Sequence, residues 1–246
     1  MEKIKNVKIN KLPSLSIFFP FWNEEENIAK VVASTIPIAN KVAEKWEIIM
    51  VDDGSTDKTL EIAKRLAAKD KRLRVVTHQP NRGYGAALNS GFSHAKYKYI
   101  VFTDGDLQFN FGEVTKFVER IPEADLVIGY RKKRRDRNLL KRLLLMYLLK
   151  LNVFILFRVH FKDIDCAFKM FRKEAIETIM PIRSEGAMVS TEILAKAKRK
   201  KLRIAEVGVT HYPRTHGDQS GANFQVVLRA IFESFILWWD LKNGRY

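Results

Sequence analysis

The chain is short of cysteine and of long apolar runs, and each shortage excludes a class of protein. Cys166 is the single cysteine, so no disulfide can form within the chain, and this fits a reducing compartment. Residues 1–13 are charged and lack the apolar core of a signal peptide. No uninterrupted apolar run reaches the roughly 18 residues that indicate a membrane span. We therefore expect a cytoplasmic protein that does not cross a membrane.

Acidic residues are also scarce relative to basic ones. The 246 residues include 28 acidic and 44 basic side chains, which gives a formal net charge of +16. Such an excess indicates an anionic partner: nucleic acid, a nucleotide or an anionic membrane. The chain carries no zinc-finger spacing and no RNA-recognition signature, and this disfavours nucleic acid.

The first half alternates between apolar strands and helical segments. Runs of strand length lie at residues 15–21, 46–51, 73–77 and 99–103. Helical segments follow the first three at about residues 23–35, 58–69 and 83–95. Asn23 resembles an N-cap of the first helix, with Glu26 completing a capping box. The alternation predicts an α/β fold with a mostly parallel sheet flanked by helices.

The second half is less regular, and no repeat or Pro-rich linker separates it from the first. A strand at 125–129 is followed by a basic run at 131–137 and a long, helix-like apolar stretch at 139–161. The remaining expected segments are a loop entering a short strand at 163–173, a helix at 189–200 and a strand at 202–209. A last, amphipathic helix at 222–241 carries an apolar stripe of Phe224, Leu228, Ile231, Phe235 and Trp238.

Acidic side chains follow three of the expected strands. Glu24 lies beyond the first strand, Asp52 and Asp53 beyond the second, and Asp104 and Asp106 beyond the fourth. Because ligands of open α/β sheets bind beyond the carboxyl ends of the strands, we expect these carboxylates along one edge.

Asp104 and Asp106, separated by one glycine, can converge on a hard divalent cation such as Mg²⁺ or Mn²⁺. Gln108 adds a neutral oxygen ligand nearby. Such a cation would neutralise charge on a departing nucleoside diphosphate. The simpler alternative is an acidic turn that caps a helix, but the position after a strand, beside the other acidic clusters, favours the metal site.

Two further turns can hold parts of a nucleotide. Asp52 and Asp53 can accept hydrogen bonds from a base N–H or from ribose hydroxyls, while Asp57 in the same turn is explained by helix capping. Arg82 and Gly83 stand at a Gly-rich helix entry, where backbone N–H groups can approach a phosphate. A plain tight turn is the alternative there.

Basic and apolar segments lie next to each other in the second half. The basic run at 131–137 followed by the apolar stretch suits an anionic leaflet, although a solvated loop and a buried helix would give the same pattern. Arg214, in a loop after a strand, can hold a phosphate group bidentately. His211 can act as a further metal ligand, although a histidine in a core or loop is commoner.

Taken together, these motifs resemble family 2 glycosyltransferases of the GT-A fold. The matching segments are SIFFPFWNEE at 16–25, VDDGSTD at 51–57, NRG at 81–83 and TDGDLQ at 103–108. In the second half, DIDCAFKMFR at 163–172 resembles the acceptor-side segment of the dolichol-phosphate mannose synthase branch. HYPR at 211–214, with Gly217 and Ser220, resembles the Arg-Gly-Ser loop of polyprenyl-phosphate glycosyltransferases. The chain departs from many members at Phe109, Asn110 and Phe111, where they carry His-Pro-Pro.

The resemblance implies a Rossmann-like GT-A sheet and inverting sugar transfer with magnesium or manganese. It assigns the nucleotide to Pro20, Trp22, Glu24, Asp52 and Asp53, next to the phosphate-binding turn of Arg82 and Gly83. It also implies that Asp104 contacts the donor, that Asp106 and Gln108 hold the metal, and that Arg214 faces phosphate groups. Asp165 would shape the acceptor site, or act as a base if the acceptor were a hydroxyl.

We expect a single domain over residues 1–246, with a donor half at about 14–108 and an acceptor half, including membrane-surface helices, at about 109–246. The expected donor is a GDP- or UDP-sugar, and the expected acceptor is a polyprenyl or dolichyl phosphate. The protein would lie peripherally on the inner face of an anionic membrane, with a separate membrane-anchor protein as a further candidate partner and no nucleic acid.

Two alternatives stay open. The first is transfer to a soluble glycan or protein. The second is a non-catalytic nucleotide- or nucleic-acid-binding protein, which the acidic sheet edge disfavours, because its carboxylates would repel a phosphate backbone unless a metal intervened.

Overall fold

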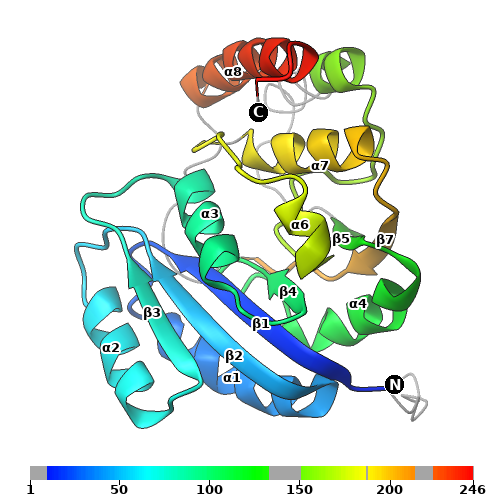
Figure 1. The fold of residues 1–246 in the computed structure, drawn as a ribbon. Helices are drawn as coiled ribbons and strands as arrows, with labels where there is room; N and C mark the ends of the chain where they lie inside the picture. Colours follow the sequence, from blue (N-terminus) through cyan, green and yellow to red (C-terminus); the bar gives the residue numbers. More distant parts are fainter. Residues whose placement is uncertain (1–9, 133–150, 187, 214–223, 246) are drawn as a thin grey trace.

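The computed structural model describes residues 10–132, 151–186, 188–213 and 224–245, which build a sheet with helices on both faces (Figure 1). Within these residues the sheet has seven strands in the order β3-β2-β1-β4-β6-β5-β7. The strands are β1 (Leu12–Phe21), β2 (Ala43–Asp52), β3 (Leu73–Thr77), β4 (Tyr99–Phe102), β5 (Leu126–Arg131), β6 (Lys169–Arg172) and β7 (Ile204–Val209). Only β6 runs antiparallel to its neighbours, β4 and β5. The expected mostly parallel α/β sheet is confirmed.

Helices cover the sheet and form a cap at one end. They are α1 (Ile28–Val42), α2 (Thr59–Lys69), α3 (Tyr84–His94), α4 (Val114–Arg120), α6 (Lys173–Glu177), α7 (Val189–Arg199) and α8 (Phe224–Lys242), with 3-10 turns η1 (Phe111–Glu113) and η2 (Ile121–Glu123). Figure 1 shows α3 in front of the sheet, α1 behind it, and α8 as the outermost layer above α7. No helix within the described ranges is long and apolar enough to span a membrane.

An aromatic cluster fixes α3 against the middle of the sheet. The ring of Phe18 in β1 lies 5.2 Å from that of Phe102 in β4 and 5.0 Å from that of Phe92 in α3. A Cβ added at Gly91 would lie 2.3 Å from the Phe18 ring, so glycine is needed for this close approach. The packing sets where the amino end of α3 meets the carboxyl ends of the strands.

Expected and observed elements agree in the first half except at the first helix. The four strands correspond to β1–β4, and the second and third helices to α2 and α3. The prediction that Asn23 caps a helix is wrong. Asn23 has a left-handed backbone (φ +54°), and its side-chain oxygen accepts a hydrogen bond from Thr56 N at 2.8 Å. The first helix begins only at Ile28 because the preceding residues join the ends of β1 and β2.

In the second half, the expected strands and helices correspond to β5, α7, β7 and α8, and the loop at 163–168 leads into β6 as expected. Of the long apolar stretch, residues 139–150 lie outside the described residues. Residues 151–157 are helical, and the helix ends at Arg158, which has φ +53°. Most of the basic run at 131–137 also lies outside the described residues.

A buried carboxylate in β2 joins neighbouring parts of the sheet. Glu47 is fully buried and accepts hydrogen bonds from Ser16 Oγ (2.7 Å), Arg74 Nη1 (2.9 Å) and Lys96 N (3.1 Å). Burial alone would raise the pKa of Glu47, but these donors outweigh it and hold the pKa below its usual value. Ionised Glu47 therefore fastens the connection between α3 and β4 onto β1 and β2.

We expect Glu47→Gln to lower the free energy of unfolding near neutral pH by about 1.5–3 kcal/mol, the usual range for hydrogen bonds to a charged group. Because the folded-state pKa is depressed, this stabilisation is full above the unfolded-state pKa and is lost as the pH falls through the folded-state pKa. Urea unfolding at neutral and acidic pH measures it. Glu44→Gln, an exposed change on the same strand, is the control. If the difference in unfolding free energy between wild type and Glu47→Gln were as large at acidic pH as at neutral pH, this role of Glu47 would be contradicted.

Candidate active site

A cleft of about 680 Å³ lies beyond the carboxyl ends of β1 and β2, beside the amino end of α3 and the turn after β4. Seven of the expected site residues line it: Pro20, Trp22, Glu24, Asp53, Gly83, Asp104 and Asp106. The three acidic clusters therefore meet at one sheet edge, as the strand alternation predicted.

The other expected site residues lie elsewhere. Asp52, Arg82 and Gln108 are not among the described residues that line this cleft. Asp165 is exposed, on the loop at 163–168 that precedes β6. Arg214 lies outside the described residues, so its contact with a phosphate stays a prediction.

The Asp104 carboxylate is strongly perturbed by its surroundings. Burial, followed by the nearby Asp106 carboxylate, raises the pKa of Asp104 to about 7, against the lowering effects of the Tyr84 hydroxyl and of the Lys169 charge. The Tyr84 hydroxyl donates to Asp104 Oδ1 at 2.9 Å. Burial and the Asp104 charge raise the pKa of Tyr84 well above its usual value, so this phenol stays a donor.

Two like charges held together in a cleft suit a divalent cation. Asp104 and Asp106 offer hard oxygen ligands, and a bound cation would relieve the repulsion that raises the pKa of Asp104. No cluster of three or more His, Cys, Asp or Glu side chains placed to hold a metal occurs within the described residues. The donor set therefore fits an ion such as Mg²⁺ that takes one or two protein carboxylates and completes its shell with substrate phosphates and water.

The turn after β4 is held by the segment that leads to Arg214. Asp106 Oδ1 accepts a hydrogen bond from Gln108 N at 3.0 Å. Gln108 in turn donates from Nε2 to Tyr212 O at 3.0 Å and accepts at its carbonyl from Tyr212 N at 2.8 Å. Phe109 and His211 form an antiparallel bridge, with their rings 5.1 Å apart. The side-chain amide of Gln108, an expected metal ligand, is thus engaged in holding residues 211–212 beside the acidic turn.

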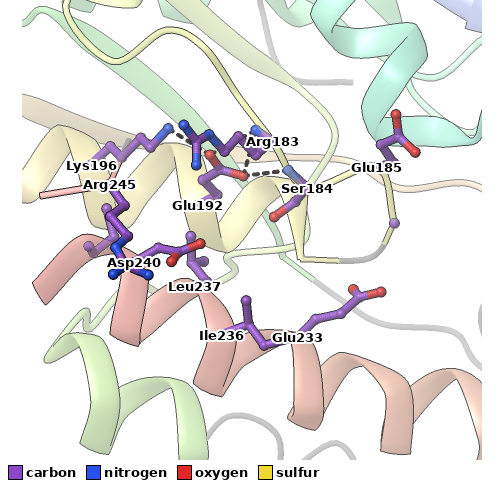
Figure 2. Close-up of a pocket in the computed structure, with 12 residues that line it drawn as sticks. Arg183, Ser184, Glu185, Glu192, Lys196, Glu233, Ile236, Leu237, Asp240 and Arg245 are labelled. Atoms are coloured by element: carbon purple, nitrogen blue, oxygen red, sulfur yellow. Dashed lines mark hydrogen bonds and ion pairs between the residues drawn. The ribbon is translucent and has the colours of Figure 1, made fainter. Parts of the chain in front are cut away.

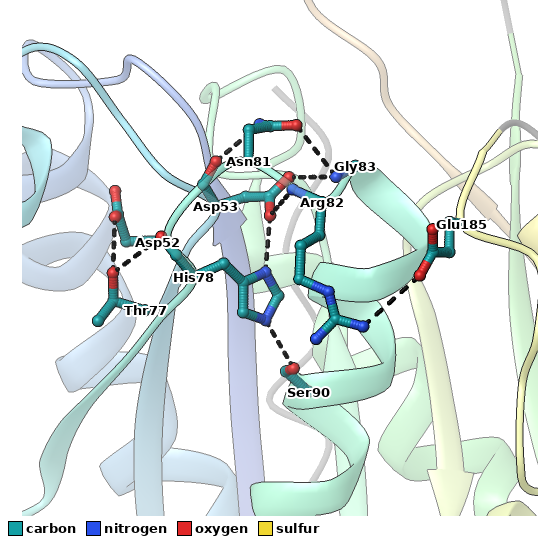
Figure 3. A network of polar contacts seen from close by, with 9 residues as sticks. All are labelled: Asp52, Asp53, Thr77, His78, Asn81, Arg82, Gly83, Ser90 and Glu185. Atoms are coloured by element: carbon teal, nitrogen blue, oxygen red, sulfur yellow. Dashed lines mark hydrogen bonds and ion pairs between the residues drawn. The ribbon is translucent and has the colours of Figure 1, made fainter.

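Asp53 organises the turn between β3 and α3 (Figure 3). Its carboxylate accepts from Arg82 N (3.0 Å) and Gly83 N (2.8 Å) and contacts His78 Nδ1 at 2.7 Å. A carboxylate can only accept, so Nδ1 of His78 carries the proton, and Nε2 lies 2.8 Å from Ser90 Oγ. The two backbone N–H groups expected to meet a phosphate are therefore occupied by Asp53 in this structure.

Asp52 has a different environment from its neighbour. Its side chain is buried, and Oδ2 accepts from Thr77 Oγ1 at 3.1 Å. Oδ1 has no hydrogen-bond partner among the described residues. A buried acceptor without a partner costs free energy, so this oxygen is open to an added donor at the end of β2.

A loop from the second half packs against the turn at residues 82–85. Glu185 O accepts from Gly85 N at 2.9 Å, and the Arg82 guanidinium lies 3.5 Å from the Glu185 carboxylate. A Cβ added at Gly85 would lie 2.0 Å from Ser184 O. The glycines at the start of α3 thus serve close packing against residues 184–185.

A buried ion pair in α7 holds that loop in place (Figure 2). Glu192 accepts hydrogen bonds from Arg183 N at 2.9 Å and Ser184 N at 2.7 Å. It also pairs with Lys196 at 2.7 Å, and both side chains are buried. Burial alone would raise the pKa of Glu192, but the Lys196 and backbone donors hold it below its usual value.

Two other charged residues shape the loop at 163–168. Arg131 binds the Asp163 carboxylate bidentately, with Nε–Oδ2 at 2.6 Å and Nη2–Oδ1 at 2.9 Å. Lys169, fully buried, donates to Cys166 O, to Ile164 O at 3.1 Å and to Ser190 Oγ at 3.2 Å. Exposed Asp165 is therefore carried on a loop that is fastened at both ends.

Sequence reasoning missed several residues that hold the site together: His78, Tyr84, Lys169 and Glu192. Lys169 carried a usable signal, since a lysine inside the apolar segment AFKMF is expected to be buried with partners. His78 follows β3 directly, at the edge where the other clusters meet, and this position was a second signal.

The model of Glycosyl transferase family 2 matches residues 16–180. The chain belongs to this family. It is similar to a dodecaprenyl-phosphate galacturonate synthase of Rhizobium johnstonii, with 28% identity over 94% of the chain and 70% of the relative. It is also similar to a dolichyl-phosphate beta-glucosyltransferase of Saccharomyces cerevisiae, with 31% identity over 80% of the chain and 66% of the relative. The expected family is confirmed.

A solved structure shares the fold of this family member. Glucosyl-3-phosphoglycerate synthase from Mycobacterium tuberculosis, in complex with Mn²⁺, UDP and phosphoglyceric acid, superposes with a TM-score of 0.68. The match covers 92% of the chain and 78% of that structure at 22% identity. The GT-A architecture expected from the motifs is therefore confirmed.

We expect Gly85→Ala to disrupt the contact between α3 and residues 184–185, because its Cβ would overlap a backbone carbonyl. Thermal unfolding should show a loss of roughly 1–3 kcal/mol, and calorimetry should show weaker binding of UDP or GDP. Gly186→Ala, whose Cβ would meet only the flexible Glu233 carboxylate at 3.4 Å, is the matched control. Equal behaviour of the two variants would rule out this packing role.

Proposed function

We propose that the protein is an inverting glycosyltransferase that moves a sugar from a nucleotide-sugar to a polyprenyl phosphate at a membrane surface. The observation that carries the proposal is the meeting of Asp104 and Asp106 with Trp22 and Glu24 in one cleft of a family 2 chain. Both relatives named above carry a dodecaprenyl- or dolichyl-phosphate in their names, which supports a lipid phosphate as the acceptor.

The nucleotide of the donor, UDP or GDP, would occupy the cleft from the end of β2 to the turn after β4. A base bound at the end of β2 would reach the buried Asp52 Oδ1 only after a local rearrangement, because Asp52 does not line the cleft in this structure. Pro20 and Glu24 line the same cleft. The Arg82 side chain, rather than the occupied N–H groups of its turn, would supply positive charge near the diphosphate.

Asp104 and Asp106 would hold Mg²⁺ or Mn²⁺ against the diphosphate. The protein needs this cation because its own carboxylates would otherwise repel the anionic donor. A bound cation of this kind neutralises charge on the leaving diphosphate. Tyr84 orients Asp104 through its hydroxyl, and Gln108 orients Asp106 through its backbone N–H.

The acceptor needs no strong base on the protein. A lipid phosphate is already anionic near neutral pH, so one of its oxygens attacks the anomeric carbon directly. The new bond forms on the face opposite the diphosphate as the old bond breaks, and the configuration inverts. Exposed Asp165 would border the acceptor rather than remove a proton, and Arg214 would face phosphate groups. Residues 211–212, which shortly precede Arg214, are held beside the turn that carries Asp104 and Asp106, so the chain leads toward the proposed phosphate site.

Trp22 would stack on the base of the nucleotide, since this residue lines the cleft and is 53% exposed. We expect Trp22→Ala to weaken UDP or GDP binding roughly 5- to 150-fold, as for the loss of one base–aromatic stack of about 1–3 kcal/mol. Trp22→Phe retains a stacking ring and is the matched control. Titration calorimetry measures both, and unchanged affinity in Trp22→Ala would remove Trp22 from the base site.

The decisive assay combines the purified protein with Mn²⁺, polyprenyl phosphate in detergent and a panel of UDP- and GDP-sugars. We expect release of nucleoside diphosphate that depends on the lipid and occurs with one donor. Asp106→Asn should lower the rate by about 100-fold or more, because it weakens the site of the cation. Glu119→Gln, an exposed change in α4, should leave the rate unchanged.

Each other outcome has a defined meaning. Full activity of Asp106→Asn would exclude its role in holding a metal. Release without lipid would assign another acceptor, such as a soluble glycan or protein, or donor hydrolysis. A protein that binds nucleotide but transfers no sugar from any donor would count against the enzymatic proposal.

A further inference from the structure

α8 has two opposite apolar faces, and only one of them is buried. Ala230, Ser234, Leu237 and Leu241 turn inward and are at most 9% exposed. At about 100° per residue, the opposite side of the helix carries Phe232, Phe235, Ile236 and Trp239. These four side chains, here called the outer apolar face, are 48–67% exposed. A helix on a water-facing surface would carry polar residues at these positions.

The outer apolar face differs from the stripe expected from the sequence. Within that stripe, Phe224 and Leu228 have no described side chains, Ile231 and Trp238 are partly buried, and Phe235 is exposed. The exposed surface therefore arises from the way α8 is seated on α7, which the sequence pattern alone did not reveal.

The helix at 151–157 extends this apolar surface. It exposes Leu151, Phe154 and Ile155, which are 42–63% exposed. Asn152 Oδ1 accepts a hydrogen bond from Ser234 Oγ at 2.6 Å, so this helix packs directly beside α8. Both lie in the outermost layer of the molecule (Figure 1). Exposed apolar surface shared by two helices marks a site of interaction with a partner or a membrane.

Basic residues beside the outer apolar face indicate which kind of partner binds there. Next to the outer apolar face, a pocket of about 490 Å³ is lined by Arg158, Lys198, Arg199 and Lys242. Its remaining walls are apolar, and no carboxylate is among the described residues that line it. The Lys242 ammonium lies 4.9 Å from the centre of the Trp238 ring, an arrangement in which a long cation rests on apolar surface. We call these four residues the basic pocket.

The flank of α8 opposite the basic pocket faces the loop at 183–186. Glu233 and Asp240 line a separate pocket with the loop at 183–186 (Figure 2). Basic residues, Arg183, Lys196 and Arg245, also line this second pocket, so it differs from the basic pocket in carrying charges of both signs. Through that loop, α8 is connected to the glycines at the start of α3 and hence to the cleft.

We propose that this end of the molecule docks onto an anionic bilayer, with the outer apolar face in the headgroup region and a phospholipid phosphate in the basic pocket. Lysine and arginine beside aromatic and aliphatic side chains meet both demands of such a surface. Nucleic acid would use the charges but leave the apolar face in water. The inference deepens the proposed function, on which its setting rests, by naming the surface that meets the membrane.

Flotation with vesicles tests the docking without any use of catalysis. We expect the protein to bind phosphatidylcholine vesicles that contain about 30% phosphatidylglycerol, and to bind pure phosphatidylcholine far more weakly. The variant Lys198→Gln/Arg199→Gln/Lys242→Gln should lower the partition coefficient by on the order of 100-fold. Phe232→Ser/Trp239→Ser should also reduce binding, because the apolar contribution is lost.

The matched control removes the same charge elsewhere. Lys64→Gln/Lys69→Gln/Lys71→Gln alters exposed lysines in and after α2, at the far end of the molecule, and should bind vesicles nearly as well as wild type. Equal loss in the two triple variants would reduce the effect to net charge and overturn the proposal. So would full binding by Phe232→Ser/Trp239→Ser, or tighter binding of a single-stranded RNA than of vesicles that is lost with the basic pocket.

A comparison of assays separates this inference from the proposed function. The basic-pocket variant should keep transfer to polyprenyl phosphate in detergent and lose it when the lipid is presented in anionic vesicles. Vesicle binding without any sugar transfer would leave the docking surface intact while the enzymatic proposal fails. Transfer with wild-type efficiency on vesicles by the variant would overturn the docking surface alone.

Discussion

The shape of the candidate active site depends on one buried carboxylate, that of Asp53 at the end of β2. It gathers two backbone N–H groups and an imidazole from the turn that leads into α3. Without these donors a buried carboxylate would be costly, and without the carboxylate the turn would have three unsatisfied donors. The Asp53 carboxylate and its three donors therefore stabilise each other, and together they place α3 at the mouth of the cleft.

The same rule applies in the described part of the second half, where Glu192, Lys169 and Asp163 are buried as partners of backbone groups or of other charges. Glu192 holds residues 183–184, Lys169 holds the carbonyls at 164 and 166, and Arg131 holds Asp163. These residues fix loops rather than build helices or strands. The loops in turn form the surroundings in which the Asp106 charge, together with burial, raises the pKa of Asp104.

Much of the fold could be predicted from the sequence because hydrophobic periodicity decides it. The runs that became β1 to β4 are almost wholly apolar, and parallel strands buried on both faces have this pattern. The position of the acidic clusters followed from the same alternation, since the ends of parallel strands share one edge. The alternation predicted that Glu24, Asp104 and Asp106 share one sheet edge, and all three line the cleft in the structure.

What could not be predicted depends on contacts between residues distant in the sequence. Asparagine often caps a helix, but the side-chain oxygen of Asn23 accepts a hydrogen bond from Thr56 N in the next loop. A glycine at position 85 is typical of a tight turn, but in the structure it leaves room for the backbone carbonyl of Ser184, almost a hundred residues later. The orientation of α8 is likewise set by its packing on α7 and the neighbouring helix, so the predicted apolar stripe did not show which apolar side chains would be buried and which exposed.

The contact between Gly85 and residues 184–185 has a consequence for how such enzymes diverge. The loop at 183–186 that packs against the start of α3 belongs to the second half of the chain, and Glu192 holds it there. A change in either segment therefore alters the packing of the other. Chimeras that exchange residues 14–108 between relatives should work only when the partner loop at 183–186 travels with them, so the two segments form one unit of exchange although they are separated in the gene.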